Sequence, residues 1–370
     1  MTRDLPPVPF LDLVAMQAEV VDGIEADLAS VLRQAGFIGG PHVEAFEQEY
    51  AEFVGARHCV GVSNGTDAIE VSLRALGVGF GDEVITAANT FVATVEAIQR
   101  TGAKPVLADV DDEFLLLDPE AVGAAVTART KAVIPVHLYG QMAPLEAIAA
   151  AAAGIPVVED AAQSQGATQG GRVSGSVGAV ASTSFYPGKN LGAAGDAGAL
   201  TTSDPELARR ARTILNHGSE RKYEHEVFGF NARLDAVQAV VLRHKLRRLA
   251  DWNAARRVAA DRYASLLGDL AGVRQPSVKA GNEHVWHLYV TRVADRDRVL
   301  SELQAAGIGA ALHYPYPVHL TAAFAGLGYG AGAFPVAERA AGEVLSLPMF
   351  PHLTAAMQER VAAELSSAVR

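Results

Sequence analysis

Residues 179–202 read AVASTSFYPGKNLGAAGDAGALTT, two β-rich runs on either side of a glycine-rich turn that contains Lys189. Runs that are apolar over most of their length are typical of strands buried on both faces of a sheet. Glycine lets the backbone approach another group closely, and an ordinary surface loop gives no reason for so many glycines beside a lysine. We therefore expect Lys189 to follow a buried strand and to lie in a partly desolvated site.

The same alternation extends back toward residue 57, where short β-rich runs are separated by helical stretches. It predicts an α/β fold with a mostly parallel sheet that helices cover on both faces. In such folds ligands bind beyond the carboxyl ends of the strands. The expected strands are 59–63, 83–86, 105–108, 132–136, 155–159, 179–185 and 199–202, and the expected helices are 66–76, 91–100, 119–126 and 143–153.

The pattern changes after residue 234. A long helix is expected over 234–267, because leucine and valine recur along one stripe with basic residues between them. A strand over 285–290 and a helix over 298–306 follow it. We predict a large α/β domain over 1–250, including the N-terminal segment, and a smaller α+β domain over 251–370.

Composition excludes several classes of protein. The chain has 370 residues, a formal net charge of −11 and one cysteine. The acidic excess argues against nucleic-acid and anionic membrane partners, and one cysteine excludes an internal disulfide. His284 and His287 are three residues apart in an expected strand, so their side chains should point to opposite faces and hold no metal. With no targeting segment visible, we expect a cytoplasmic protein.

Three polar features follow expected strands, each with a plainer alternative. The stretch Ser63-Asn-Gly-Thr-Asp67 opens a helix, whose free amides favour a phosphate, although an ordinary helix cap reads the same way. Asp160 could hold a protonated ring nitrogen or cap a helix. Lys189, with a lowered pKa, could form an imine with an aldehyde, or lie on the surface. Together they describe a pyridoxal phosphate site.

With these features the chain resembles the DegT/DnrJ/EryC1/StrS family of pyridoxal-phosphate sugar aminotransferases. The resemblance implies the type I fold of such enzymes, which is aspartate aminotransferase-like, and pyridoxal 5′-phosphate as the cofactor. It covers nearly the whole chain. The matching motifs are residues 36–41, 63–68, 88–94, 135–140, 159–163, 184–192, 216–219, 231–235 and 313–315.

The resemblance implies a role for the residues around the cofactor ring. Lys189 would hold the cofactor through an imine and later move a proton. Asp160 would keep the ring nitrogen protonated, and Gln163 would face the ring hydroxyl. Phe91 would stack on the ring, the alternative being a place in the hydrophobic core.

The resemblance also implies phosphate and substrate contacts. Gly65, Thr66 and Ser184 would bind the cofactor phosphate. Asn231 would reach the phosphate of the partner subunit, so the active unit would be a homodimer with shared active sites. The residues expected to face the sugar or the amino donor are Tyr223, His313 and Tyr314.

Lysine at position 189 is typical of the aminotransferases, because related sugar dehydratases have histidine there. The residues around it resemble those of enzymes that aminate C3 of a keto sugar. The implied reaction moves an amino group from L-glutamate to a dTDP-linked 3-keto-6-deoxyhexose, which gives a 3-amino-3,6-dideoxy sugar of the kind used on antibiotics. The alternatives are a C4 keto sugar, a cyclitol ketone, or a non-enzymatic regulator that binds the same cofactor.

Overall fold

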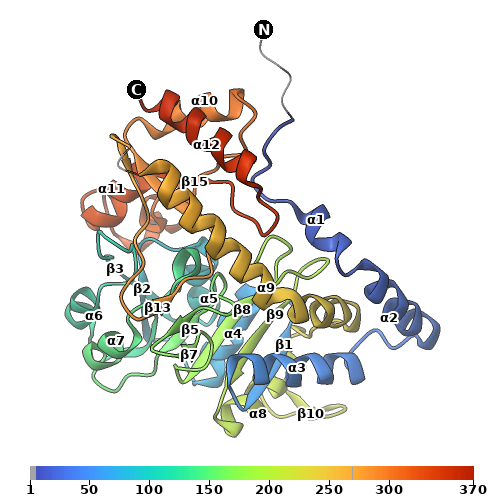
Figure 1. Cartoon of the computed structure of the whole chain (residues 1–370). Helices are drawn as coiled ribbons and strands as arrows, with labels where there is room; N and C mark the ends of the chain where they lie inside the picture. The colour runs from blue at the N-terminus through green and yellow to red at the C-terminus, as the bar shows by residue number, and fades with distance from the viewer. Residues whose placement is uncertain (1–5, 269) are drawn as a thin grey trace.

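The computed structural model describes residues 6–268 and 270–370, and it shows helices layered against a central sheet (Figure 1). The sheet has the strand order β3-β2-β4-β5-β8-β9-β1, with isolated bridges between residues 133 and 157 and between 136 and 160 joining β4 to β5. The strands are β3 (Lys104–Ala108), β2 (Glu83–Ala87), β4 (Thr130–Ile134), β5 (Val158–Asp160), β8 (Val180–Ser184), β9 (Gly198–Thr202) and β1 (His58–Val62).

Every strand expected before residue 203 is present, with its ends moved by a few residues. The sheet is mostly parallel, as predicted, but β9 runs antiparallel to both of its neighbours, β8 and β1. A parallel neighbour would need a crossover connection of a dozen or more residues, usually a helix. The glycine-rich turn after β8 contains no helix, so the chain returns directly beside β8.

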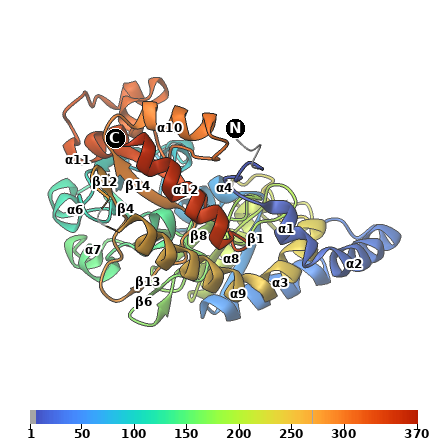
Figure 2. The ribbon, with the colours of Figure 1, turned by 45° about the horizontal axis from the view of Figure 1, so that its top comes forward.

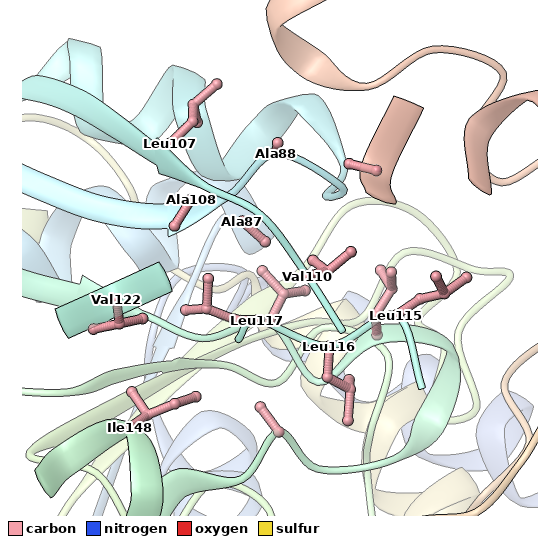
Figure 3. Packing of buried hydrophobic residues seen from close by; sticks show 14 of the residues in the cluster. Ala87, Ala88, Leu107, Ala108, Val110, Leu115, Leu116, Leu117, Val122 and Ile148 are labelled. Carbon is pink, nitrogen blue, oxygen red and sulfur yellow. The ribbon is translucent and has the colours of Figure 1, made fainter. Parts of the chain in front are cut away.

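Helices cover both faces of the sheet. On one face α4 (Gly65–Ala75), α5 (Val92–Arg100) and α8 (Pro205–Leu215) pack on a core that includes Val62, Val158 and Leu200. The opposite face is covered by α6 (Pro119–Ala125) and α7 (Leu145–Ala151) at one end, and by α3 (Pro41–Val54) and α9 (Ala236–Leu267) at the other. Figure 3 shows the packing at the first of these ends, where side chains from β3, α6 and α7 meet.

The N-terminal segment forms helices for which no pattern was assigned: α1 (Leu13–Ala18), α2 (Val21–Gln34) and α3 (Pro41–Val54). The bounds of α3 have local causes. Pro41 occupies its first turn, and Gly55 ends it with φ +79°, a left-handed conformation that glycine adopts without a steric penalty. In both ribbon views α2 lies at the outer edge of the molecule (Figures 1 and 2).

The long helix expected over 234–267 is α9 (Ala236–Leu267), which links the sheet to the C-terminal elements (Figure 1). These are β12 (Val273–Arg274), β14 (Tyr289–Val293), α10 (Arg296–Ala305), α11 (Pro335–Glu343), β15 (Val344–Leu347) and α12 (Ala355–Ala368). The boundary predicted after residue 250 falls inside α9, and the division into two domains stays a prediction. Within the described residues, no helix combines the length and apolarity needed to cross a bilayer.

Short elements complete the structure. They are η1 (Leu138–Gly140), β6 (Thr168–Gln169), β7 (Arg172–Val173), β10 (Ser219–Arg221), β11 (Glu224–His225), β13 (Asn282–Glu283), η2 (Val318–Leu320) and η3 (Ala322–Leu327).

The bounds of the strand expected over 285–290 were wrong, because β14 begins only at Tyr289. The residues before it bind η1 instead: the amide of Val285 donates to Gly140 O (2.9 Å), and that of Leu288 to Tyr139 O (3.1 Å). His284 and His287 therefore do not alternate across a strand, which corrects the geometry on which they were judged.

Candidate active site

A cavity of about 760 Å³ lies at the carboxyl edge of β1, β5 and β8, where the α/β rule places a ligand. Residues that the sequence assigned to separate motifs meet in its wall. The predicted site residues that line it are Gly65, Thr66, Phe91, Asp160, Gln163, Ser184, Lys189, His313 and Tyr314.

Lys189 lies in the turn after β8, where its backbone amide donates to Tyr186 O (2.8 Å). Burial lowers the pKa of its amine to about 8, although the nearby carboxylate of Asp160 opposes this shift. A lysine with this pKa is partly unprotonated near neutral pH and can act as a nucleophile. The surface-loop alternative does not hold, because Lys189 lines the cavity.

Asp160 ends β5 with its carboxylate held by two donors. Thr94 Oγ1 donates to Oδ2 (2.8 Å), and the amide of Ala162 donates to Oδ1 (3.2 Å). Burial raises the pKa of Asp160, while these donors and the charge of Lys189 oppose the rise. Residues 161–167 contain turns and no helix, so Asp160 caps no helix. Thr94 belongs to the 88–94 motif, but no role had been assigned to it.

The helix N-terminus at α4 forms a cradle together with Ser184. Asn64 caps the helix by accepting from the amide of Asp67 (2.8 Å), and its carbonyl accepts from Ala68 (3.1 Å). The amides of Gly65 and Thr66 precede these bonds in the first turn, where the helix dipole favours an anion. A Cβ on Gly65 would lie 2.6 Å from Cβ of Ser184, so only glycine fits between the helix and β8.

Gln163 joins the end of β5 to the loop that contains His313 and Tyr314. Its Oε1 accepts from the amide of Tyr139 (2.7 Å), and its Nε2 donates to the hydroxyl of Tyr314 (3.0 Å). The hydroxyl of Tyr139 donates to the carbonyl of His313. This network fixes the loop as a wall of the cavity.

Two aromatic contacts complete that wall. The ring of His313 stacks on Phe10, with centroids 5.5 Å apart, and its Nδ1 lies 2.9 Å from Ser346 Oγ. Phe91 is 51% exposed and tilts against Tyr314, with centroids 5.5 Å apart. Phe91 is therefore not a core residue, which removes the alternative to a role in the cavity.

Tyr223 and Asn231 lie outside the cavity lining. Tyr223 is 81% exposed, at the turn of the β10–β11 hairpin. Asn231 is also exposed, and forms an isolated bridge with Asn216. The cavity also includes His287, which sequence reasoning missed as a site residue because its spacing from His284 was considered only for metal binding.

The model of the DegT/DnrJ/EryC1/StrS aminotransferase family matches residues 20–366. The chain belongs to this family. The match covers the cavity apart from its two N-terminal residues, Phe10 and Leu11.

Similar members of the family are known from sequence and structure. The erythromycin biosynthesis sensory transduction protein EryC1 of Saccharopolyspora erythraea is 49% identical over 97% of this chain and 99% of its own length. A dTDP-3-amino-3,4,6-trideoxy-α-D-glucose transaminase of Streptomyces venezuelae is 46% identical over 95% of this chain and 93% of its own. The crystal structure of S. venezuelae DesV in complex with a ketimine intermediate superposes with a TM-score of 0.96, at 45% identity, covering 99% of this chain and 100% of that one.

The chain is therefore a sugar aminotransferase of this family, and its cofactor is pyridoxal 5′-phosphate, which a solved relative holds in its pyridoxamine form. When bound, this cofactor supplies an aldehyde and a ring that accepts electrons. The residues present fit this cofactor. The cradle at the start of α4, where Gly65 lies close against Ser184, suits a phosphate. The buried carboxylate of Asp160 suits a protonated ring nitrogen.

The cradle makes Gly65→Ala a test of the phosphate site. The new methyl group would press on Ser184 and displace the helix from β8, so we expect pyridoxal phosphate to bind about tenfold more weakly. Absorbance titration of the cofactor-free protein measures this. Gly123→Ala in α6 is the matched control, because its Cβ would only touch Ala151 at 3.9 Å. Unchanged affinity in the Gly65 variant would contradict the assignment.

Proposed function

We propose that the enzyme transfers the amino group of L-glutamate to C3 of a dTDP-linked 3-keto-6-deoxyhexose, giving a 3-amino-3,6-dideoxy sugar. The observation that carries this proposal is the meeting of Lys189, Asp160 and the α4 cradle in one cavity. The C3 position is supported by the 46% identical relative, whose name specifies a dTDP-3-amino sugar.

Within that reaction the proposed role of Lys189 is to hold the cofactor and then to move a proton, for which a pKa of about 8 is suitable. Asp160 holds the ring nitrogen in its protonated form. Thr66 and Ser184 bind the phosphate with the first amides of α4, and Gln163 faces the ring hydroxyl. The exposed ring of Phe91 is free to stack on the cofactor.

The sugar and the amino donor are proposed to enter from the side of His313 and Tyr314. Burial, together with the charge of Lys189, lowers the pKa of His313 to about 4, so its imidazole is neutral near pH 7. A neutral imidazole and a phenol can hydrogen-bond sugar hydroxyls without attracting water as strongly as a charged group does.

We propose further that two copies of the chain form the active unit. Asn231 and Tyr223 lie away from the cavity of their own chain, which supports a role for both in the partner's site. The β10–β11 hairpin and the loop after it expose apolar side chains, with Tyr223 81% and Phe228 80% exposed. Exposed apolar groups of this kind are typical of interfaces. We place this homodimer in the cytoplasm, in keeping with its single buried cysteine.

Separate keto-sugar assays test the proposed substrate. Holoenzyme and L-glutamate are supplied with either the dTDP-linked 3-keto or the 4-keto 6-deoxyhexose, and the position of the new C–N bond is determined by NMR. We expect kcat/KM for the 3-keto sugar to exceed that for the 4-keto sugar by about 100-fold or more. Turnover of the 4-keto sugar alone would overturn the C3 assignment and favour the C4 alternative.

A further inference from the structure

His287 lies in the wall of the cavity that contains Lys189, and none of the roles assigned above uses it. It belongs to the stretch that binds η1 just before β14 begins. Its ring Nδ1 lies 3.1 Å from Oδ1 of Asn190, the residue that directly follows Lys189. His287 is thus tied to the backbone segment that positions the lysine.

The hydrogen bonds of Asn190 determine which ring nitrogen of His287 bears the proton. Asn190 Nδ2 donates to the carbonyl of Val285 (3.0 Å) and to Oδ1 of Asn253 (2.8 Å). Asn253 in turn donates from Nδ2 to the carbonyl of Gln165 (2.9 Å). The amide nitrogen of Asn190 therefore faces the two acceptors, and its oxygen faces His287. An amide oxygen only accepts, so the proton of His287 is on Nδ1.

With Nδ1 protonated, Nε2 of a neutral imidazole has a lone pair to offer. Burial lowers the pKa of His287 well below its ordinary value, and the charges of Lys189 and Arg256 lower it further, so the ring stays neutral. Nε2 receives no hydrogen bond from any residue in 6–268 or 270–370, and its ring borders the cavity. Nε2 of His287 is therefore a hydrogen-bond acceptor with no donor among these residues.

The amine of Lys189, in turn, is a donor that lacks an acceptor. Across the same residues no acceptor is hydrogen-bonded to its amine, and the one charge that raises its pKa is that of Asp160. Under the proposed function, Asp160 is occupied by the cofactor ring while Lys189 takes up and releases a proton. The protonated amine carries three donors and is buried, so it needs another acceptor.

We propose that Nε2 of His287 accepts a hydrogen bond from the amine of Lys189 while that amine is free of the cofactor, which holds it for proton transfer. His287 is then a positioning residue that acts through Lys189. This inference rests on the proton-moving role proposed for Lys189, but not on the identity of the sugar. The other titratable groups around the pair are Asp160 from β5, Arg256 from α9, His284, and the loop residues His313 and Tyr314.

Two substitutions separate the acceptor from the link to Asn190. His287→Asn keeps a donor near the position of Nδ1 and has no atom at the position of Nε2. His287→Gln does the reverse. Its amide oxygen can reach the position of Nε2 and accept a hydrogen bond there, and it has no group at the position of Nδ1. Melting temperatures are measured for both variants. If the Asn variant is unfolded, the Gln variant decides. A kcat of the Gln variant close to that of wild type supports the proposal, and a large loss of kcat contradicts it.

The pKa of Lys189 can be measured directly in the pyridoxamine-phosphate form of the enzyme, in which the amine is free. NMR of protein labelled with ¹³C at the lysine ε carbon gives a simple spectrum, and Lys189→Arg identifies the signal of interest. The chain's lysines are Lys104, Lys131, Lys189, Lys222, Lys245 and Lys279. We expect His287→Asn to lower the pKa of Lys189 by about one, because its ammonium form loses an acceptor.

Kinetics of the half reaction with L-glutamate provide the second measurement. We expect kcat to fall about tenfold in the Asn variant with KM within about twofold of wild type, since only proton transfer is impaired. An unchanged lysine pKa with unchanged kcat would overturn the proposal, as would impairment of the Gln variant alone, which would assign the effect to Asn190. A wild-type enzyme with no half reaction would instead contradict the proposed function, whatever the pKa of Lys189.

Discussion

We expect Lys189→Ala to lower the rate of amino transfer by about four orders of magnitude or more, because one side chain has both proposed roles. In the proposed mechanism it holds the cofactor and moves the proton, and no other lysine lines the cavity among the described residues. The expected readouts are loss of the absorbance band of lysine-bound cofactor and loss of the half reaction with L-glutamate, followed in a stopped-flow spectrometer.

The control for this variant is Lys131→Ala, which removes an exposed lysine from β4 and leaves the cavity untouched. It should retain wild-type kcat and the wild-type spectrum. If Lys189→Ala kept the band together with more than about a tenth of the activity, Lys189 would not be the cofactor-binding lysine.

Asp160→Asn is the substitution with the next largest expected effect, a loss of about a thousandfold in kcat. The amide is close in shape and can still accept from Thr94 and Ala162, so the fold and the cavity should survive. What it lacks is the negative charge that is proposed to keep the ring nitrogen protonated, and an unprotonated ring accepts electrons poorly. The loss should therefore appear in kcat of the half reaction, with a smaller change in cofactor affinity.

Asp261→Asn serves as the control, because Asp261 is exposed on α9 and distant in sequence from every cavity residue. It should behave as wild type in the same assay. A kcat within about tenfold of wild type in Asp160→Asn would mean that the ring nitrogen does not depend on this carboxylate.

The parts of the fold that could be predicted from sequence are those with a local cause. Strands such as β2 and β9 are buried along their whole length, so residues 84–87 and 198–202 appear as unbroken runs of apolar and small residues. The strand expected over 285–290 was misplaced for a non-local reason. The amides of Val285 and Leu288 donate hydrogen bonds to η1, which lies nearly 150 residues earlier in the chain. A pattern of apolar residues contains no sign of such a partner.

The residues of the candidate site also fall into those that local sequence could predict and those that it could not. Asp160 and Lys189 were predictable because Asp160 lies at the end of a strand and Lys189 in the turn after one, and strand ends converge in an α/β fold. Thr94 and His287 were missed because their partners, Asp160 and Asn190, lie 66 and 97 residues away and meet them only through folding. Asn231, expected to contact a second copy of the chain, and Tyr223, expected to face the sugar or the amino donor, lie outside the cavity lining, so their roles stay predictions.

The lysine that binds the cofactor of this aminotransferase can be identified directly. The holoenzyme is reduced with borohydride, which fixes the lysine-bound cofactor permanently, and is then digested and analysed by peptide mass spectrometry. We predict the pyridoxyl group on the peptide that contains Lys189, and on no other lysine. A pyridoxyl group on another lysine, such as the buried Lys245, with Lys189 unmodified, would show that Lys189 is not the cofactor-binding lysine.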